Sequence, residues 1–181
     1  DKIRENANNN PHVLKILSRC EVLEKEFFEG FEKEKKLQRK IADALGRATH
    51  ADNIQFSAFH KVSHATDASD WRSEYPAAVI YPDSVKEVSK IVRAAANAGL
   101  KIIPRGGGTG LTGGAVPVQK ETIVINTEKL NAIGKIRHEK INGNEIPVID
   151  VQCGAVTEDV IEFCNHHGFI FATDPTSAWA S

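Results

Sequence analysis

Apolar and polar residues are distributed differently in three successive stretches of this chain. In the first, apolar residues recur at near-helical spacing among dense lysines and glutamates: Val13, Leu14, Leu17, Leu37, Ile41 and Leu45. This spacing predicts two charged amphipathic helices, over residues 11–31 and 32–45, that end at Gly46. The charged run 32–40 is expected to be a solvated helix face.

The second stretch, residues 50–74, is polar and rich in turn-forming residues, and no periodicity survives there. Asp67, Ser69 and Asp70 are residue types that satisfy backbone groups in turns, which favours an ordered surface connection. A functional segment is the alternative interpretation, because a tryptophan such as Trp71 is an unusual choice for an idle loop.

The third stretch alternates short apolar runs with an amphipathic pattern. Residues 77–81, 100–103 and 122–126 are expected to be strands, and residues 85–95 a helix. The first strand, the helix and the second strand would form a βαβ unit. Ligands of open parallel sheets bind at the carboxyl ends of the strands, and a glycine-rich loop follows the second strand at that end.

The predicted helix 85–95 has clear boundary signals. Ser84 with Glu87 matches a capping box, and Gly99 supplies a C-terminal stop. One helix face gathers the apolar side chains of Val85, Val88, Ile91, Val92 and Ala95.

A hairpin and a helix are predicted closer to the C-terminus. Residues 135–152 contain a turn signal at 142–144 between two strand-like arms. Thr157 is expected to cap a helix that ends before Gly168, and residues 169–172 are expected to return as a strand.

The glycine-rich run 104–117 carries the main functional signal, because it holds six of the chain's 13 glycines. Glycine loses the most backbone freedom on folding, so such a cluster indicates positive φ angles or close approach to another group. Successive amide groups can converge on an anion, and an arginine and hydroxyls add donors. The run is therefore predicted to bind a diphosphate through Pro104, Arg105, Gly106, Gly107, Gly108, Thr109, Gly110, Leu111, Thr112 and Gly113.

Two other phosphate loops fit this run poorly. A P-loop needs a lysine after its last glycine, but Gly113 is followed by Gly114 and Ala115. Residues 108–113 match Gly-x-Gly-x-x-Gly, yet the glycines and Pro117 that follow disfavour the helix that a Rossmann site requires.

The run from Tyr75 to Pro117, together with Asp174-Pro175-Thr176-Ser177, resembles the PCMH-type FAD-binding domain of vanillyl-alcohol-oxidase-type flavoproteins. Within that superfamily it is most similar to the FAD-linked D-lactate dehydrogenase and glycolate oxidase subunit group. The resemblance covers roughly Ser63 to the C-terminus. It implies that the glycine run wraps the FAD diphosphate and that Asp174, Pro175 and Ser177 lie against the cofactor. Thr176 departs from the family's glycine, which puts a backbone contact there in doubt.

The implied fold class is α+β, with three parts. Residues 1–48 would be an N-terminal helical segment, 49–74 a connecting segment, and 75–181 the N-terminal part of the FAD-binding domain. That part would hold a small parallel βαβ sheet with helices and the start of a second, antiparallel β subdomain. Thr109 stands where covalently flavinylated members often carry histidine, so noncovalent FAD is implied.

The resemblance implies an enzyme that oxidises a small D-2-hydroxyacid by hydride transfer to FAD. The family's chain continues past Ser181, where its catalytic residues lie, so no catalytic residue is assigned and this fragment alone is expected to be inactive. The electron acceptor and any iron–sulfur domain stay unassigned. The alternatives are an enolpyruvyl sugar-nucleotide reductase of the same fold and a non-catalytic nucleotide-binding or assembly module.

Composition narrows the partners further. A net charge of −1 disfavours nucleic-acid binding, and no apolar run is long enough to span a membrane. We expect a cytoplasmic protein, with a peripheral membrane location of the full-length enzyme as the alternative. Three cysteines without metal-site spacing predict reduced thiols, with Cys153 on a strand and Cys164 on a helix buried, and no metal site. Adjacent His166 and His167 are interpreted as helix-end residues. Exposed sheet edges in a fragment would favour self-association.

Overall fold

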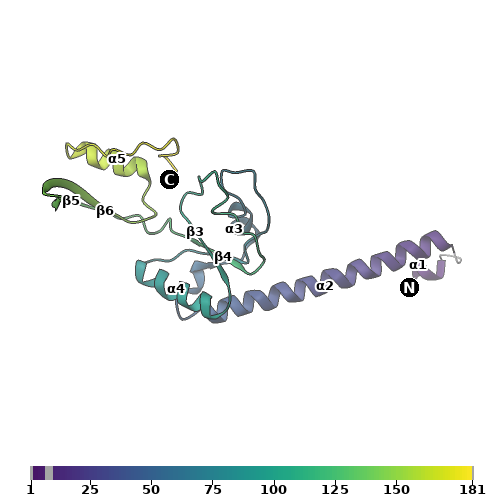
Figure 1. The fold of residues 1–181 in the computed structure, drawn as a ribbon. Coiled ribbons are helices and arrows are strands. Elements are labelled where there is room, and N and C mark those ends of the chain that lie inside the picture. The colour runs from purple at the N-terminus through teal and green to yellow at the C-terminus, as the bar shows by residue number, and fades with distance from the viewer. Residues whose placement is uncertain (1, 7–9, 181) are drawn as a thin grey trace. The chain divides into compact units, whose positions relative to one another are not determined.

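The computed structural model describes residues 2–6 and 10–180, so Asp1 and Ser181, which bound the predicted first and third parts, lie outside the described residues. The chain divides into two compact units, residues 1–39 and 40–181. The first unit is helical, and the second contains two sheets and the candidate site (Figure 1).

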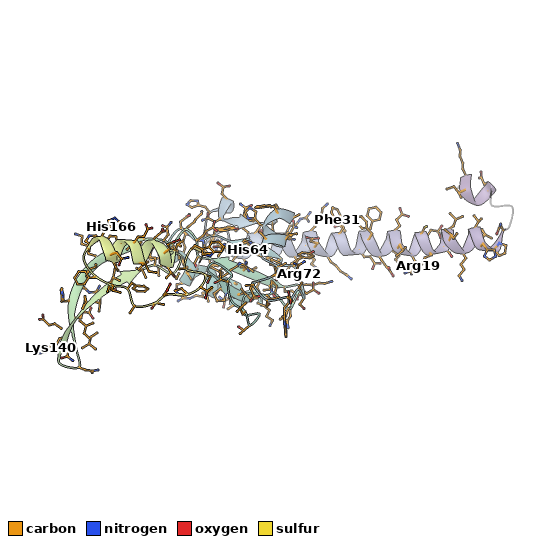
Figure 2. The ribbon with its side chains drawn as sticks, turned by 90° about the horizontal axis from the view of Figure 1, so that it is seen from above. Arg19, Phe31, His64, Arg72, Lys140 and His166 are labelled. Carbon is orange, nitrogen blue, oxygen red and sulfur yellow. The ribbon has the colours of Figure 1, made fainter. Side chains whose placement is uncertain are left out.

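The N-terminal unit contains α1 (Lys2–Asn6) and most of α2 (Pro11–Leu45). The prediction of two helices in the α2 region is wrong, because α2 runs through the expected break without interruption. A glycine inside a helix costs only about 1 kcal/mol, so Gly30 does not end it. Across the expected break, the Lys35 Nζ lies 4.3 Å from the centre of the Phe31 ring, which projects from the helix (Figure 2). No helix in the described part of the chain combines the length and apolar character that a membrane span needs.

The connecting stretch is more regular than its sequence predicts. It contains a 3₁₀ turn (Ala51–Asn53), strand β1 (Ile54–Gln55) and helix α3 (Ala58–Ser63). β1 pairs in antiparallel orientation with β2 (Ala78–Ile80), with Ile54 opposite Ile80. These elements are too short to show periodicity, and pairing with a buried strand stabilises β1.

The main sheet has the strand order β1-β2-β4-β3. β4 (Thr122–Asn126) is parallel to both β2 and β3 (Lys101–Arg105). The βαβ prediction is therefore confirmed, with β4 inserted between the two strands of the unit. Pro104 is tolerated because β3 lies at the sheet edge. Since the strands are parallel, their carboxyl ends share one edge, and the register places Arg105 opposite Asn126.

Helix α4 (Val85–Asn97) connects β2 to β3. As predicted, the Ser84 hydroxyl accepts a hydrogen bond from the backbone N–H of Glu87 (3.3 Å), and Gly99 follows the helix with a φ of 69°. The Glu87 carboxylate accepts instead from the backbone N–H of Asp83 (3.0 Å), one residue before the position in an ideal capping box.

The buried face of α4 is narrower than predicted. Ile91 and Ala95 are fully buried, whereas Val85 and Val92 are exposed. Beneath the helix, the two central strands are buried along their whole length. The tightest core cluster comprises Val79, Tyr81 and Val124, with Ile103 packed against them.

The second sheet is a hairpin of β5 (Ile133–Ile141) and β6 (Asn144–Val151), which confirms that prediction. Both turn residues have positive φ angles, 51° at Asn142 and 86° at Gly143. This is the type I′ geometry that matches the twist of paired strands. Lys140 lies near the turn (Figure 2).

Helix α5 (Thr157–His166) follows the hairpin. Thr157 is its first residue and not its cap, because the N-cap position with extended backbone is Val156. Gly168 ends the helix with a φ of 79°, as predicted. The strand predicted over 169–172 is absent, since no described strand pairs with that segment.

Both histidines at the end of α5 bond back to helix carbonyls. Nδ1 of His166 lies 2.8 Å from the carbonyl oxygen of Glu162, and Nδ1 of His167 lies 2.8 Å from that of Phe163. These contacts confirm the helix-end interpretation. Among residues 2–6 and 10–180, no group of three or more metal-ligating side chains gathers.

Candidate functional site

The glycine-rich run leaves the carboxyl end of β3 and remains non-helical until β4 begins. Gly108 and Gly113 have positive φ angles of 71° and 76°. Such angles are unfavourable for residues with a Cβ atom. Because no helix opens inside the run, it lacks the helix N-terminus on which a Rossmann site holds its diphosphate.

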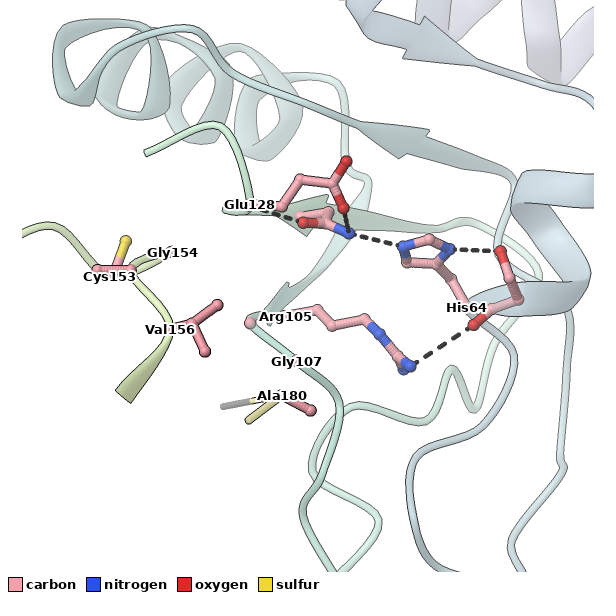
Figure 3. Close-up of a pocket in the computed structure, with 12 residues that line it drawn as sticks. His64, Arg105, Gly107, Glu128, Cys153, Gly154, Val156 and Ala180 are labelled. Carbon is pink, nitrogen blue, oxygen red and sulfur yellow. Dashed lines mark hydrogen bonds between the residues drawn. The ribbon is translucent and has the colours of Figure 1, made fainter. Parts of the chain in front are cut away.

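Arg105 ends β3, and its side chain runs beside the glycine loop toward α3 (Figure 3). Its guanidinium donates to the carbonyl oxygens of Thr66 (Nη1–O 2.6 Å) and Ser63 (Nη2–O 3.5 Å). A Cβ atom at Gly108 would overlap this guanidinium. The missing side chain at Gly108 therefore makes room for Arg105. Burial lowers the pKa of the Arg105 guanidinium, and the charge of Asp67 opposes this effect.

The turn formed by residues 66–71 packs against the glycine loop. The Asp67 carboxylate accepts hydrogen bonds from the Ser69 backbone N–H (2.9 Å) and hydroxyl (2.5 Å), which lower the pKa of Asp67. The backbone N–H of Ala68 donates to the carbonyl oxygen of Gly110 (3.1 Å). The turn prediction for Asp67 and Ser69 is confirmed, but the same turn also holds the loop in place.

Trp71 ends this turn and lies against the far part of the loop. Atoms of its indole ring are 3.8 Å from the position that a Cβ atom would take at Gly113. The Thr66 hydroxyl fixes the turn by donating to the carbonyl oxygen of Trp71 (3.0 Å). Two-thirds of Trp71 stays exposed, so the indole presents an aromatic surface beside the loop.

A pocket of about 340 Å³ opens where β3 and β4 end. The glycine loop contributes Arg105, Gly106 and Gly107, and the opposite side is made by the segment that joins the hairpin to α5. The lining residues are Ser63, His64, Arg105, Gly106, Gly107, Asn126, Glu128, Cys153, Gly154, Ala155, Val156 and Ala180.

One side of the pocket carries a chain of polar contacts (Figure 3). Nε2 of His64 lies 2.9 Å from Nδ2 of Asn126, which also donates to the Glu128 carboxylate (3.1 Å). The Asn126 side-chain oxygen accepts from the backbone N–H of Glu128 (2.8 Å). Burial is the main cause that lowers the pKa of His64.

The opposite side is backbone-rich and tightly packed. The backbone N–H of Gly154 donates to the carbonyl oxygen of Leu130 (2.8 Å), and a Cβ atom at Gly154 would overlap the carbonyl oxygen of Thr127. The prediction of a buried Cys153 on a strand is wrong, because it is exposed and follows β6 in a turn. Cys164 is buried on α5, as predicted.

The Asp174-Pro175-Thr176-Ser177 segment lies near this side of the pocket. Its turn continues through bonds from Ala178 N–H to the Pro175 carbonyl and from Ala180 N–H to the Ser177 carbonyl, both 2.9 Å. Ala178 in turn accepts from the backbone N–H of Glu158 in α5 (3.0 Å). The turn is thus attached to α5, and its last described residue, Ala180, lines the pocket.

The structure brings only some of the predicted cofactor residues together. Arg105, Gly106 and Gly107 line the pocket, whereas Pro104 lies in β3 and residues 108–113 continue along the loop. Asp174, Pro175 and Ser177 precede Ala180 without lining the pocket. Sequence reasoning missed His64, Asn126, Glu128 and residues 153–156. Only Asn126 had a usable signal, a polar residue at the end of an apolar strand.

Residues 76–180 match the FAD binding domain family. Among curated proteins, the chain is 30% identical over 112 residues to a D-2-hydroxyglutarate dehydrogenase of Arabidopsis thaliana, covering 60% of this chain and 19% of that protein. It is 26% identical over 141 residues to the glycolate oxidase subunit GlcD of Bacillus subtilis, covering 78% of this chain and 28% of the relative. The chain thus spans less than a third of either relative.

A solved alkyldihydroxyacetonephosphate synthase superposes with a TM-score of 0.66 at 19% identity, covering 79% of this chain and 27% of that one. At this identity the likeness shows the fold. The expected FAD-binding fold is thereby confirmed.

Proposed function

The chain belongs to the FAD binding domain family, and from that premise we propose that it is the diphosphate-binding part of a flavin-dependent oxidoreductase acting on a D-2-hydroxyacid. The names of its curated relatives support this substrate class, since they include dehydrogenases of D-2-hydroxyglutarate and D-lactate and a glycolate oxidase subunit. The observation that carries the proposal is the pocket formed by Arg105, Gly106 and Gly107 at the carboxyl edge of the parallel sheet.

The residues present fit a diphosphate. Gly106 and Gly107 put backbone without side chains against the pocket, so a ligand can approach the main chain closely. Arg105 adds a buried positive charge at the same place. Thr66 and Ser63 carbonyls hold its guanidinium without neutralising that charge. A volume of about 340 Å³ is within the range of small-molecule sites, about 300–1,000 Å³.

Bound FAD would supply the hydride acceptor, and the residues of this chain would bind and orient it. The 66–71 turn and the Arg105 bonds fix the glycine loop before a ligand arrives, which reduces the entropy lost on binding. The loop offers a hydroxyl at Thr109, not a nucleophilic ring nitrogen, which supports a noncovalent cofactor.

A charge placed in the pocket tests the proposal. FAD is titrated into the wild-type chain, the Gly106→Asp variant and the Gly114→Asp variant, with flavin fluorescence as the readout. A Cβ atom at Gly106 would meet only the Cys153 carbonyl oxygen at 3.9 Å, and one at Gly114 would meet nothing within 4 Å, so both variants should fold.

A carboxylate about 5 Å from a phosphate charge costs about 3 kcal/mol at an effective dielectric constant of about 20. Gly106→Asp should therefore weaken FAD binding at least about a hundredfold. Gly114→Asp carries the same charge outside the pocket lining and should change affinity by less than about threefold. The proposal fails if the wild-type chain binds no FAD, or if both aspartates weaken binding equally.

A further inference from the structure

The pocket contains a buried imidazole to which the diphosphate proposal gives no role. His64 directly follows α3 and is only 7% exposed. Its Nδ1 lies 2.9 Å from the carbonyl oxygen of His60, and its Nε2 lies 2.9 Å from Nδ2 of Asn126. The imidazole also makes an edge contact with the ring of Tyr81, with centroids 5.9 Å apart. Both ring nitrogens therefore have partners that restrict where the proton sits.

The contacts define one protonation state of His64. A backbone carbonyl only accepts, so Nδ1 must carry a hydrogen toward His60. The Asn126 amide is oriented by the backbone N–H of Glu128, which requires the side-chain oxygen on that side. Nδ2 of Asn126 therefore faces His64, and Nε2 must accept from it. The imidazole is neutral, with its hydrogen on Nδ1.

This state fixes the neighbouring polar groups. One Asn126 amide hydrogen points to His64 Nε2 and the other to the Glu128 carboxylate. Protonation of Nε2 would set two donors against each other, so Asn126 would have to turn away. The Glu128 carboxylate would then lose the donor that holds it at the edge of the pocket.

Charged and titratable groups surround His64 on several elements. His60 lies in α3 and Tyr81 follows β2, while Arg105 ends β3 and Glu128 follows β4. Arg105 and His60 oppose a positive charge on His64, and Glu128 favours one. Burial adds to the opposition and has the largest effect, so the pKa of His64 lies below its ordinary value.

We propose that neutral His64 is a positioning residue that, through Asn126, holds the Glu128 carboxylate to accept hydrogen bonds from hydroxyl groups of the bound cofactor. The inference rests on the proposed FAD function. A carboxylate accepts from sugar or ribityl hydroxyls and repels phosphate, so Glu128 complements the cationic, glycine-lined part of the same pocket.

The test compares FAD affinity between pH 5 and 8 for the wild-type chain, His64→Gln and His64→Phe. Glutamine places an amide oxygen near Nε2 and does not titrate, whereas phenylalanine keeps the ring shape without an acceptor. Nitrogen NMR shifts of His64 in the ligand-free wild-type chain report its tautomer independently of the cofactor.

We expect the NMR shifts to show the Nδ1–H tautomer. Wild-type affinity should fall about tenfold as acidification protonates His64, the effect of losing one buried hydrogen bond. His64→Gln should stay close to wild type at pH 8 and be flat with pH. His64→Phe should bind about tenfold more weakly throughout.

Four outcomes would overturn the proposal. An Nε2–H tautomer contradicts its geometry. Identical pH profiles for the wild type and His64→Gln refute the positioning role while leaving the FAD function intact. Affinity that rises on acidification would show that the imidazolium contacts the anionic cofactor directly. Absence of FAD binding by the wild type refutes the proposed function together with this role.

Discussion

Replacing Gly108 by alanine should destabilise the protein mainly by displacing Arg105. The new Cβ atom would overlap the guanidinium, which must then leave the Thr66 and Ser63 carbonyl oxygens. Hydrogen bonds from a charged donor contribute about 1.5–3 kcal/mol. The φ angle of 71° adds about 1–2 kcal/mol of backbone strain for a residue with a Cβ atom. The expected loss in unfolding free energy is therefore about 3–5 kcal/mol.

A double-mutant cycle separates these two contributions. With Arg105→Ala already present, Gly108→Ala should cost only the strain of about 1–2 kcal/mol, leaving a coupling energy of about 1.5–3 kcal/mol. Urea unfolding of the four proteins measures it. Gly114→Ala, on the same loop with open space around it, is the matched control and should be nearly neutral. Equal costs of Gly108→Ala in both backgrounds would refute the idea that Gly108 makes room for Arg105.

Two further predictions concern the supports of the site. Gly154→Ala should lower the unfolding free energy by about 3 kcal/mol and the melting temperature by about 6–12 °C, because its Cβ atom meets rigid backbone carbonyls of Thr127 and Leu130; a melting temperature within 2 °C of wild type in calorimetry would contradict this. The depressed pKa of Asp67 means that its stabilising effect is complete above the usual Asp pKa of about 3.9 and is lost as the pH falls through its lower folded value. Asp67→Asn should therefore flatten the acid limb of stability measured by urea unfolding between pH 6 and 3, and an unchanged limb would mean that Asp67 is not responsible.

Elements with local signals could be predicted from the sequence. The capping serine and Gly99 marked α4, and the residues 142–144 marked the hairpin, because caps and turns are decided by backbone conformation at a few positions. α2 was split wrongly because the charged stretch after Phe31 resembles a new amphipathic pattern, although nothing there breaks the helix. β1 and α3 escaped because their stability comes from partners distant in sequence.

The site shows the same division. The glycine run predicted its own loop, since glycine content directly reflects backbone requirements. It could not predict that Arg105 would be bound by carbonyls 39 and 42 residues earlier, or that His64 and Asn126, 62 residues apart, would meet. Such contacts depend on strand order, and the sequence contains no local sign that β4 inserts between β2 and β3.

Strand order also explains why the pocket lies where it does. Inserting β4 between β2 and β3 places Asn126 directly opposite Arg105, at the edge where the glycine loop begins. A loop after an edge strand alone would be open on one side and poorly fixed. Here the 66–71 turn holds the loop on one side, and Arg105 connects it to the end of α3. The glycines thus provide the space for a ligand, and segments brought in by the sheet provide the order that binding requires.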